Sequence, residues 1–360
     1  MKIGILGAGQ LGRMMAISGY PLNHQFGFSG NSSSEPAALL GHMFTQENNI
    51  EYLTNFADVI TYESENTDVE VVKKINKNVR VYPSEKSLFI TQHRGREKAL
   101  FEQLNIPCAP YQIINSLADL KQAVSKIGLP AILKTATEGY DGKGQFVIRS
   151  DAQIEEAFAS MNGAESILEG FVNFKRELSL IAVRGLDNDH KYYPLVENTH
   201  HQGILRLTIA PAQAIDPEVQ KTAEQYIQTL LDAMDHIGVL TIELFETDNG
   251  LMVNEMAPRV HNSGHWSIEG ANTSQFENHI RAISNMPLGD TTSTHAFSAM
   301  INIIGKLGPI ERVLKMPNAH LHLYDKTERA KRKLGHINIT ANSQKALDFS
   351  LQQLQDFLPQ

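Results

Sequence analysis

The 360-residue sequence contains a single cysteine, Cys108. With one cysteine no disulfide can form within the chain, and such a composition fits a reducing compartment. Cys108 directly follows Pro107, and we interpret it as a small apolar residue rather than as a catalytic thiol. We therefore expect the protein in the cytoplasm.

Long apolar runs and an excess of basic residues are also missing. No stretch approaches the roughly 20 apolar residues that span a bilayer, and the first seven residues are too short for a signal peptide. The 32 Lys and Arg are outnumbered by 40 Asp and Glu, which gives a net charge of -8. This balance argues against a nucleic-acid-binding surface, but it leaves room for a local basic pocket that takes a phosphorylated small molecule. We expect neither a membrane nor a nucleic-acid partner.

The length favours two or three domains, because one compact core seldom serves so long a chain. In the first part, strands alternate with helices, which predicts a Rossmann-like parallel α/β sheet in residues 1–93. The expected strands are 2–7, 25–29, 59–62 and 79–82, and the expected helices are 13–17 and 69–76.

From residue 94 the pattern becomes α+β, and we place a second domain at 94–293 and a small β-rich domain ending in a helix at 294–360. The expected helices are 96–104, 117–127 and 218–234. The expected strands are 111–114, 131–134, 145–148, 167–169, 177–183, 192–196, 239–245, 251–255, 299–304, 320–324 and 336–339.

The turn Gly7-Ala-Gly-Gln-Leu-Gly12 matches the dinucleotide fingerprint, between a strand and a helix. An NAD site usually has an acidic residue at the end of the second strand, and here Ser29-Gly-Asn-Ser follows instead. Three uses stay open: a nicotinamide cofactor, another phosphorylated ligand at the helix N-terminus, or a structural turn.

A second glycine-rich segment, Glu138-Gly-Tyr-Asp-Gly-Lys-Gly144, follows the strand that ends in Lys134. Glycines let backbone N–H groups approach phosphate oxygens, and the lysine adds a positive charge. The segment lacks the Gly-Lys-Ser/Thr of a Walker loop. A simple hairpin turn is the alternative.

Two acidic residues lie on one expected hairpin. If Asp248-Asn-Gly250 forms a three-residue loop, Glu243 lies directly opposite Glu255, whereas a one-residue slip places it opposite Asn254. Opposed carboxylates repel unless a cation lies between them, and Mg²⁺ bridging to phosphates is the natural occupant. Solvated strand acids are the alternative.

A polar cluster follows this hairpin beyond Pro258, with Arg259, His261, Asn262, Ser263 and His265. The segment is too polar for a core, and its side chains suit an anion. A metal-binding carboxylate and an anion site are thus neighbours, which indicates chemistry on phosphates or carboxylates.

Together these segments resemble the ATP-grasp superfamily and, within it, the 5-(carboxyamino)imidazole ribonucleotide synthases. The likeness runs along nearly the whole chain. It is carried by Gly9–Met14, Gly139–Gln145, Asn254–Arg259, His261–Trp266, Leu321–Lys326 and Arg332–His336, of which the last three are specific to this enzyme.

The resemblance implies a carbon–nitrogen ligase of purine biosynthesis, usually a homodimer, that uses ATP and Mg²⁺ and neither NAD, flavin nor biotin. Its substrates are bicarbonate and 5-aminoimidazole ribonucleotide (AIR). Carboxyphosphate forms first and breaks down toward carbon dioxide, which the exocyclic amine of AIR captures.

The resemblance also implies the site residues. ATP binding falls to Arg94, Lys134, Gly139, Tyr140, Asp141, Gly142, Lys143, Gly144, Gln145, Glu169, Gly170, Phe171, Val172, Glu177, His200, Asn254 and Glu255. Glu243 and Glu255 are the implied metal ligands. The second substrate falls to Glu63, Tyr140, Asp141, Arg259, His261, Asn262, Ser263, Lys326 and Arg332, of which Arg259, His261 and Asp141 are the catalytic candidates.

Two segments depart from the family pattern. Gly95 occupies a helix start where leucine is common and lowers helix propensity by up to ~1 kcal/mol, and His201-Gln202 replaces a common acidic residue. Other ATP-grasp ligases, such as the formate-dependent glycinamide ribonucleotide transformylase or biotin carboxylase, lack the specific segments. An NAD-dependent oxidoreductase leaves Glu243 and Glu255 unexplained, and a nucleotide sensor leaves the intact acids without a use.

Overall fold

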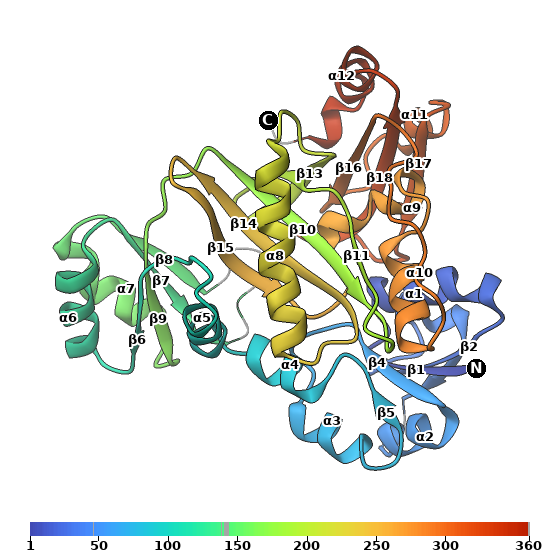
Figure 1. The fold of residues 1–360 in the computed structure, drawn as a ribbon, viewed down its shortest axis with the longest axis horizontal. Coiled ribbons are helices and arrows are strands. Elements are labelled where there is room, and N and C mark those ends of the chain that lie inside the picture. The colour runs from blue at the N-terminus through green and yellow to red at the C-terminus, as the bar shows by residue number, and fades with distance from the viewer. Residues whose placement is uncertain (46, 138, 140–143, 359–360) are drawn as a thin grey trace.

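The computed structural model describes residues 1–45, 47–137, 139 and 144–358, and three β-sheets organise this part of the chain (Figure 1). The expected fold class is confirmed: a parallel sheet domain comes first, an ATP-grasp-like α+β unit follows, and a β-rich segment ends the chain. The domain boundaries themselves remain a prediction.

The first sheet is parallel, with the order β3-β2-β1-β4-β5. Its central strands are buried along almost their whole length, as expected where helices cover both faces of a parallel sheet. The strands are β1 (Lys2–Leu6), β2 (Gln25–Ser29), β3 (His42–Phe44), β4 (Val59–Tyr62) and β5 (Arg80–Val81), and the helices are α1 (Gln10–Gly19), α2 (Asn49–Phe56), α3 (Val69–Ile75) and α4 (Glu85–Thr91). The chain order reverses between β1 and β4, so their carboxyl ends form the switch point where ligands of such sheets bind.

The second sheet is a four-stranded antiparallel unit, which stands apart from the rest of the molecule in Figure 1. It contains β6 (Tyr111–Ile114), β7 (Ala131–Thr135), β8 (Gln145–Ile148) and β9 (Ser166–Gly170) in the order β6-β9-β7-β8, with α6 (Leu117–Ile127) and α7 (Ile154–Ser160). Helix α5 (Arg94–Gln103) leads into it. These elements enclose their own apolar cluster, built around Leu120, Leu133 and Leu168.

The third sheet has nine strands, and eight of them follow the order β15-β14-β10-β12-β13-β16-β18-β17, with β11 paired to β10. The strands are β10 (Arg176–Arg184), β11 (His190–Tyr192), β12 (Val196–His201), β13 (Ile204–Ala210), β14 (Gly238–Thr247), β15 (Gly250–Ala257), β16 (Phe297–Ile304), β17 (Ala319–Leu323) and β18 (Lys333–Ala341). The helices are α8 (Pro217–Ala233), α9 (Ser267–Gly270), α10 (Gln275–Ile283), α11 (Ile310–Leu314) and α12 (Gln344–Gln353). The C-terminal strands therefore extend the central sheet through the β13–β16 pairing.

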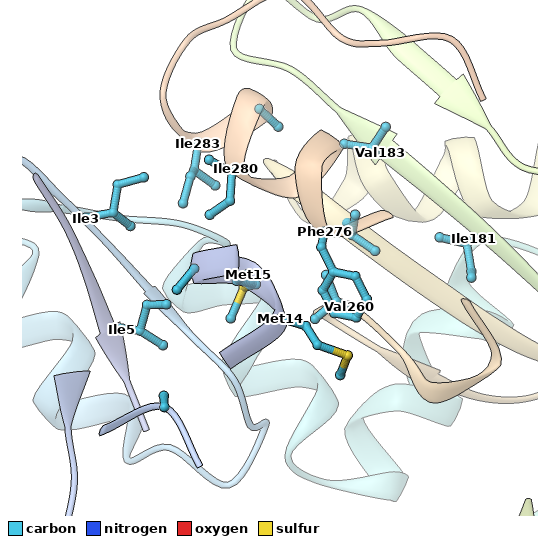
Figure 2. Close-up of a cluster of buried hydrophobic side chains, with 14 of the residues drawn as sticks. Ile3, Ile5, Met14, Met15, Ile181, Val183, Val260, Phe276, Ile280 and Ile283 are labelled. Carbon is cyan, nitrogen blue, oxygen red and sulfur yellow. The ribbon is translucent and has the colours of Figure 1, made fainter. Parts of the chain in front are cut away.

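One apolar core joins the first sheet to the third. Figure 2 shows Met14 and Met15 of α1 between Ile5 of β1 on one side and Phe276 of α10 on the other. Because α1 packs directly on α10, the glycine turn at the start of α1 is held at a fixed place beside the third sheet.

Several expected elements differ from the structure. The helix expected at 13–17 is the longer α1 (Gln10–Gly19), and the strand expected at 336–339 is the longer β18 (Lys333–Ala341). Residues 193–195 separate β11 from β12, so the predicted strand 192–196 is wrong; it contains Pro194, which cannot donate to a β-ladder. The helix predicted at 96–104 begins two residues earlier, because the His93 side chain caps the N–H groups of Gly95 and Arg96. A Cβ at Gly95 would lie 2.5 Å from Ile113 Cδ1, so a larger residue there requires the end of the Ile113 side chain to move.

Candidate active site

The hairpin of β14 and β15 brings the two predicted metal carboxylates together. Thr247 pairs with Gly250 around a two-residue turn, not the predicted three-residue loop, and this register alone would put Glu243 opposite Asn254. A β-bulge between Leu244 and Glu243 restores the alignment, so Glu243 pairs with Glu255. The predicted pairing is thus confirmed, but the bulge produces it.

The two carboxyl groups titrate differently. Burial and the charge of Glu255 raise the pKa of Glu243 to about 7. Burial opposes ionisation of Glu255 too, but the charge and the 2.7 Å hydrogen bond of Arg94 Nη1 hold the pKa of Glu255 below its usual value. A cation between the two groups would stabilise both carboxylates in the ionised form.

Arg94 and Lys134, the predicted phosphate ligands, lie in one cluster with two acids. Lys134 Nζ donates to Glu169 Oε2 at 3.0 Å, and Arg94 Nη2 donates to the Gly139 carbonyl at 2.9 Å. Burial raises the pKa of Glu169, but Lys134 and Lys98 outweigh that effect and bring it to about 2. The side chain of Glu169 therefore faces the cations, as an ionised partner.

The predicted adenine segment Glu169–Val172 ends β9 and continues beyond it. The N–H groups of Gly170 and Phe171 already donate to the carbonyls of Pro110 and Pro130, at 2.9 and 3.2 Å. These two N–H groups are therefore occupied, and recognition of a base by this segment has to use its other backbone groups.

Glu177 and His200, predicted nucleotide contacts, form a pair between neighbouring strands. His200 Nδ1 lies 3.0 Å from Glu177 Oε2. Burial lowers the pKa of His200, but the bond to Glu177 and the charge of Glu243 outweigh burial and raise it. The pair thus lies within electrostatic range of the metal carboxylates.

Part of the predicted phosphate loop lies outside the described residues, namely Tyr140, Asp141, Gly142 and Lys143. At its C-terminal end, the Gly144 carbonyl accepts a hydrogen bond from Thr135 N, and Gln145 pairs with Lys134 across β7 and β8. This end of the loop is therefore fixed next to Lys134.

Beyond β15, Arg259 and His261 lie on the other side of the metal carboxylates. Arg259 donates from Nε and Nη2 to both oxygens of Glu65, the latter at 2.8 Å, and His261 Nε2 lies 3.4 Å from Glu243 Oε1. Burial and the charge of Arg259 lower the pKa of His261 to about 3, which keeps its ring neutral.

Asn262 has a partner in the third sheet, and Ser263 has one in the same polar segment. Ser263 Oγ lies 2.8 Å from His261 Nδ1. Asn262 exchanges two amide hydrogen bonds with Asn302 of β16, at 2.7 and 3.1 Å. These contacts fix the cluster that follows Pro258.

The glycine turn at the start of α1 holds a carboxylate of the protein itself. Glu63, at the end of β4, accepts hydrogen bonds from Gly9 N at 2.6 Å and Gly12 N at 2.8 Å. A Cβ at Gly7 would lie 2.5 Å from Glu63, and φ there is +111°. A carboxylate at this helix N-terminus repels a pyrophosphate, which counts against the nicotinamide reading.

Lys326, in the loop after β17, reaches the same turn and bonds to Gln10 Oε1 of α1. Burial and the positive charge of Arg332 lower the pKa of Lys326 to about 8, while Glu63 acts in the opposite direction. Arg332 itself bonds to Thr327 Oγ1 at 2.8 Å. The structure therefore brings Glu63, Lys326 and Arg332 together from both ends of the chain.

Three functional neighbours escaped the sequence analysis: Glu65, which holds Arg259, and Glu97 and Lys98 in α5. Lys98 and Glu97 are almost fully buried, with 1% and 3% exposure. Their partners are about 160 to 190 residues away in the chain, so no local pattern reveals them. The only sequence signal concerned Glu65, which repeats an acidic residue two positions after Glu63.

Comparison with known families agrees with this geometry. Residues 1–92 match the ribonucleotide synthetase preATP-grasp domain, residues 99–276 the ATP-grasp domain, and residues 298–349 the phosphoribosylaminoimidazole carboxylase C-terminal domain. The fold and these matches define the class: the chain is an ATP-grasp enzyme.

Individual relatives narrow the class. The N5-carboxyaminoimidazole ribonucleotide synthase of Pseudomonas aeruginosa is 46% identical over 343 residues, which cover 94% of each chain. The crystal structure of the N5-carboxyaminoimidazole ribonucleotide synthetase from Thermus thermophilus has a TM-score of 0.95 and 43% identity over 99% of each chain. The chain belongs to the N5-carboxyaminoimidazole ribonucleotide synthase family, the ligases that convert AIR and bicarbonate to N5-carboxyaminoimidazole ribonucleotide with ATP in purine biosynthesis.

A relative with bound ligands bears on the site. The Aspergillus clavatus enzyme, 31% identical with a TM-score of 0.92 over 99% of this chain and 98% of its own, was solved with ADP and AIR. Among the helices of the described residues, none combines the length and the apolar composition that a membrane span requires.

Proposed function

We propose that this chain carries out the family reaction at the site described above, with ATP, bicarbonate and AIR as substrates. A bicarbonate oxygen attacks the γ-phosphorus, the bond to the β-phosphate oxygen breaks, and ADP leaves. Carboxyphosphate then loses phosphate to give carbon dioxide, and the exocyclic amine of AIR attacks the carbon and releases a proton. The main support is the pairing of Glu243 with Glu255 beside Arg94 and Lys134.

On the ATP side, Lys134 and Arg94 bind the phosphates and the segment Gly139–Gln145, with Tyr140, Asp141, Gly142 and Lys143, covers them. Because both cations are paired with carboxylates, their positions are fixed before the nucleotide arrives. Glu177 and His200 bind the ribose side, and Glu169–Val172 border the base.

Mg²⁺ is assigned to Glu243 and Glu255, with the amide of Asn254 next to them. The donor set fits this ion, because Mg²⁺ prefers oxygen ligands and takes few of them from protein when phosphates supply the rest. The described residues contain no group of three or more His, Cys, Asp or Glu that could hold a metal ion. When bound, the ion neutralises the phosphate charge.

On the acceptor side, Arg259 and His261 bind bicarbonate and carboxyphosphate, and Lys326 and Arg332 bind the phosphate of AIR. Glu63, Asn262 and Ser263 complete the AIR site with Tyr140 and Asp141. The neutral ring of His261 lies between Glu243 and Ser263, which places it at the boundary between the metal and the second substrate. Asp141, from the covering loop, is the third catalytic candidate.

Two further proposals concern the whole protein. A homodimer follows from the family resemblance, and sedimentation at micromolar concentration tests it: a monomer mass would contradict it. A cytoplasmic location is supported by the single cysteine, which cannot form a disulfide within the chain. Fractionation of cells that express the chain tests the location.

The decisive experiment measures ADP release with ATP, Mg²⁺ and bicarbonate, with and without AIR. AIR is expected to stimulate the release and to be converted to its carboxyamino product. Absence of stimulation would refute the proposed reaction, and titration with NADH, monitored by fluorescence, would then test the oxidoreductase alternative.

A further inference from the structure

Helix α5 packs against β15 at the point where the bulge changes the register of the strand. Lys98 Nζ donates to the Asn254 carbonyl at 2.8 Å, and Met256 N donates to Glu97 Oε1 at 2.7 Å. These two consecutive side chains of α5 therefore bond to backbone groups on both sides of Glu255.

The backbone of β15 departs from regular alternation here. Val253 N donates to the Pro107 carbonyl at 2.8 Å, so both Val253 and Met256 direct their N–H groups away from β14. In a regular strand, N–H groups three residues apart point to opposite sides. The extra residue, Asn254, accounts for the difference.

Without the bulge, the register at Leu244 and Val253 would continue, and Glu255 would lie opposite Ile242. Ile242 is fully buried in an apolar cluster with Met256 and Leu244. Because neighbouring residues of a strand point to opposite faces, the slip would turn Glu255 away from Glu243. The bulge is thus what puts both acids on one face.

The two side chains of α5 are costly to bury. Lys98 has Glu169 Oε2 at 3.6 Å and the Asn254 carbonyl as partners. Burial and the charge of Glu255 raise the pKa of Glu97 to about 8, while Lys98 and Arg94 act in the opposite direction. Buried ionisable groups of this kind seldom add net stability, and their best-attested use is to fix a register. A purely structural contact between α5 and β15 could be apolar.

We propose that Glu97 and Lys98 are positioning residues that hold the bulge at Asn254 and thereby place Glu255 opposite Glu243 as a pair of cation ligands. The inference rests on the Mg²⁺ role proposed above. Both residues act on Glu255 through the backbone of β15, and Lys98 also pairs with Glu169.

The test compares Glu97→Leu with Glu97→Gln, because glutamine keeps an oxygen that can accept from Met256 N and leucine does not. Mn²⁺ binding in the presence of ADP is measured by electron paramagnetic resonance, with Glu102→Leu on the same helix as the matched control. We expect Glu97→Leu to weaken Mn²⁺ affinity roughly 10–100-fold, the usual range for residues that orient metal ligands. Glu97→Gln and Glu102→Leu should bind as the unaltered protein does.

A second readout uses the metal-free protein, so that it is independent of the Mg²⁺ role. Amide hydrogen exchange of residues 251–257 should accelerate in Glu97→Leu and not in Glu97→Gln. If Glu97→Leu does not fold, Lys98→Met takes its place, with Lys121→Met as its control. Lys98→Met removes the bond to the Asn254 carbonyl, the ion pair with Glu169 and the contact of the ammonium group with the Phe101 ring. Unchanged exchange and unchanged Mn²⁺ affinity in the folded variant would overturn the proposal, and so would equal damage by Glu97→Gln.

If Glu243 and Glu255 do not bind the metal, a different set of variants shows it. If Glu243→Gln and Glu255→Gln both leave Mn²⁺ affinity unchanged, the assignment of Mg²⁺ to this pair is refuted. The hydrogen exchange of Glu97→Leu then decides by itself whether α5 holds the bulge.

Discussion

The chain has two glycine-rich turns that follow buried strands, one at Gly7–Gly12 after β1 and one at Gly139–Gly144 after β7. At the first, backbone N–H groups of Gly9 and Gly12 bind the carboxylate of Glu63. Near the second, the positive groups are the side chains of Lys134 and Arg94, which are paired with acids. The first turn is neutralised by a carboxylate of the chain itself, whereas the second adjoins charged side chains that can also contact phosphates. A glycine pattern alone does not distinguish these situations.

The largest expected effect is a loss of turnover when the nucleotide side, and not the first turn, is changed. Glu255→Gln removes one metal carboxylate, and kcat should fall on the order of 10²-fold or more, as when one electrostatic contact to a transferring group is lost. The fold should persist, because glutamine keeps an oxygen that can accept the hydrogen bond from Arg94. Steady-state ADP release and circular dichroism measure the two quantities. Near-normal turnover would contradict the metal assignment.

The next effect concerns binding of ATP. Lys134→Met removes a charged phosphate ligand, a contact worth roughly 1.5–3 kcal/mol, so KM for ATP should rise about 10- to 100-fold. KM for AIR should change little. Lys175→Met, which breaks the exposed pair with Asp248, is the control and should leave both constants unchanged. A rise confined to KM for AIR would reverse the assignment of the two turns.

A smaller effect is expected at the first turn. Glu63→Gln leaves one acceptor oxygen for the two N–H groups of Gly9 and Gly12, which should lower the free energy of unfolding by roughly 1–3 kcal/mol. KM for AIR should rise while KM for ATP stays constant. Urea denaturation and initial rates measure these changes. A higher KM for ATP would instead show that the first turn serves the nucleotide.

The smallest effect is a difference in pH dependence. Glu169 has a pKa lowered to about 2, so its ionisation stabilises the fold above pH 4.5, and this contribution is lost as the pH falls toward 2. Burial raises the pKa of Glu63, so stability falls as the pH rises from 4.5 through that higher pKa. Urea denaturation between pH 4 and 7 should show opposite slopes for the stability lost in Glu169→Gln and Glu63→Gln. If the stability lost in the two variants changed with pH in the same direction, the proposed difference between Glu169 and Glu63 would be wrong.

Local sequence patterns were enough to predict most helices and strands and to single out Glu243 and Glu255 as a pair of acids. The first parallel sheet, the helix 117–127 and the hairpin carry clear alternation or turn residues, and the structure has them. Strand β13 was missed although Ile204–Ala210 is rich in apolar and β-branched residues, and β12 was missed because Val196–His201 is mostly polar. The two strands pair with each other across a turn at Gln202 and Gly203, and β13 also pairs with the distant β16.

The site residues also divide into those that local sequence reveals and those that depend on long-range packing. The partnership of Glu243 and Glu255 could be predicted because both lie on one hairpin, although the reason given was a loop that the chain does not form. Glu65, Glu97 and Lys98 could not be predicted, since their partners Arg259, Met256 and Asn254 lie more than 150 residues away in the chain. Long-range packing, not residue type, makes them functional neighbours.

The continuity of the third sheet also limits how the chain can be shortened. A chain that ended before Phe297 would expose Ile204–Ala210 as an unpaired apolar edge. Exposed edges of this kind template association between copies. We expect such a truncated protein to aggregate, even though every nucleotide-binding residue would still be present.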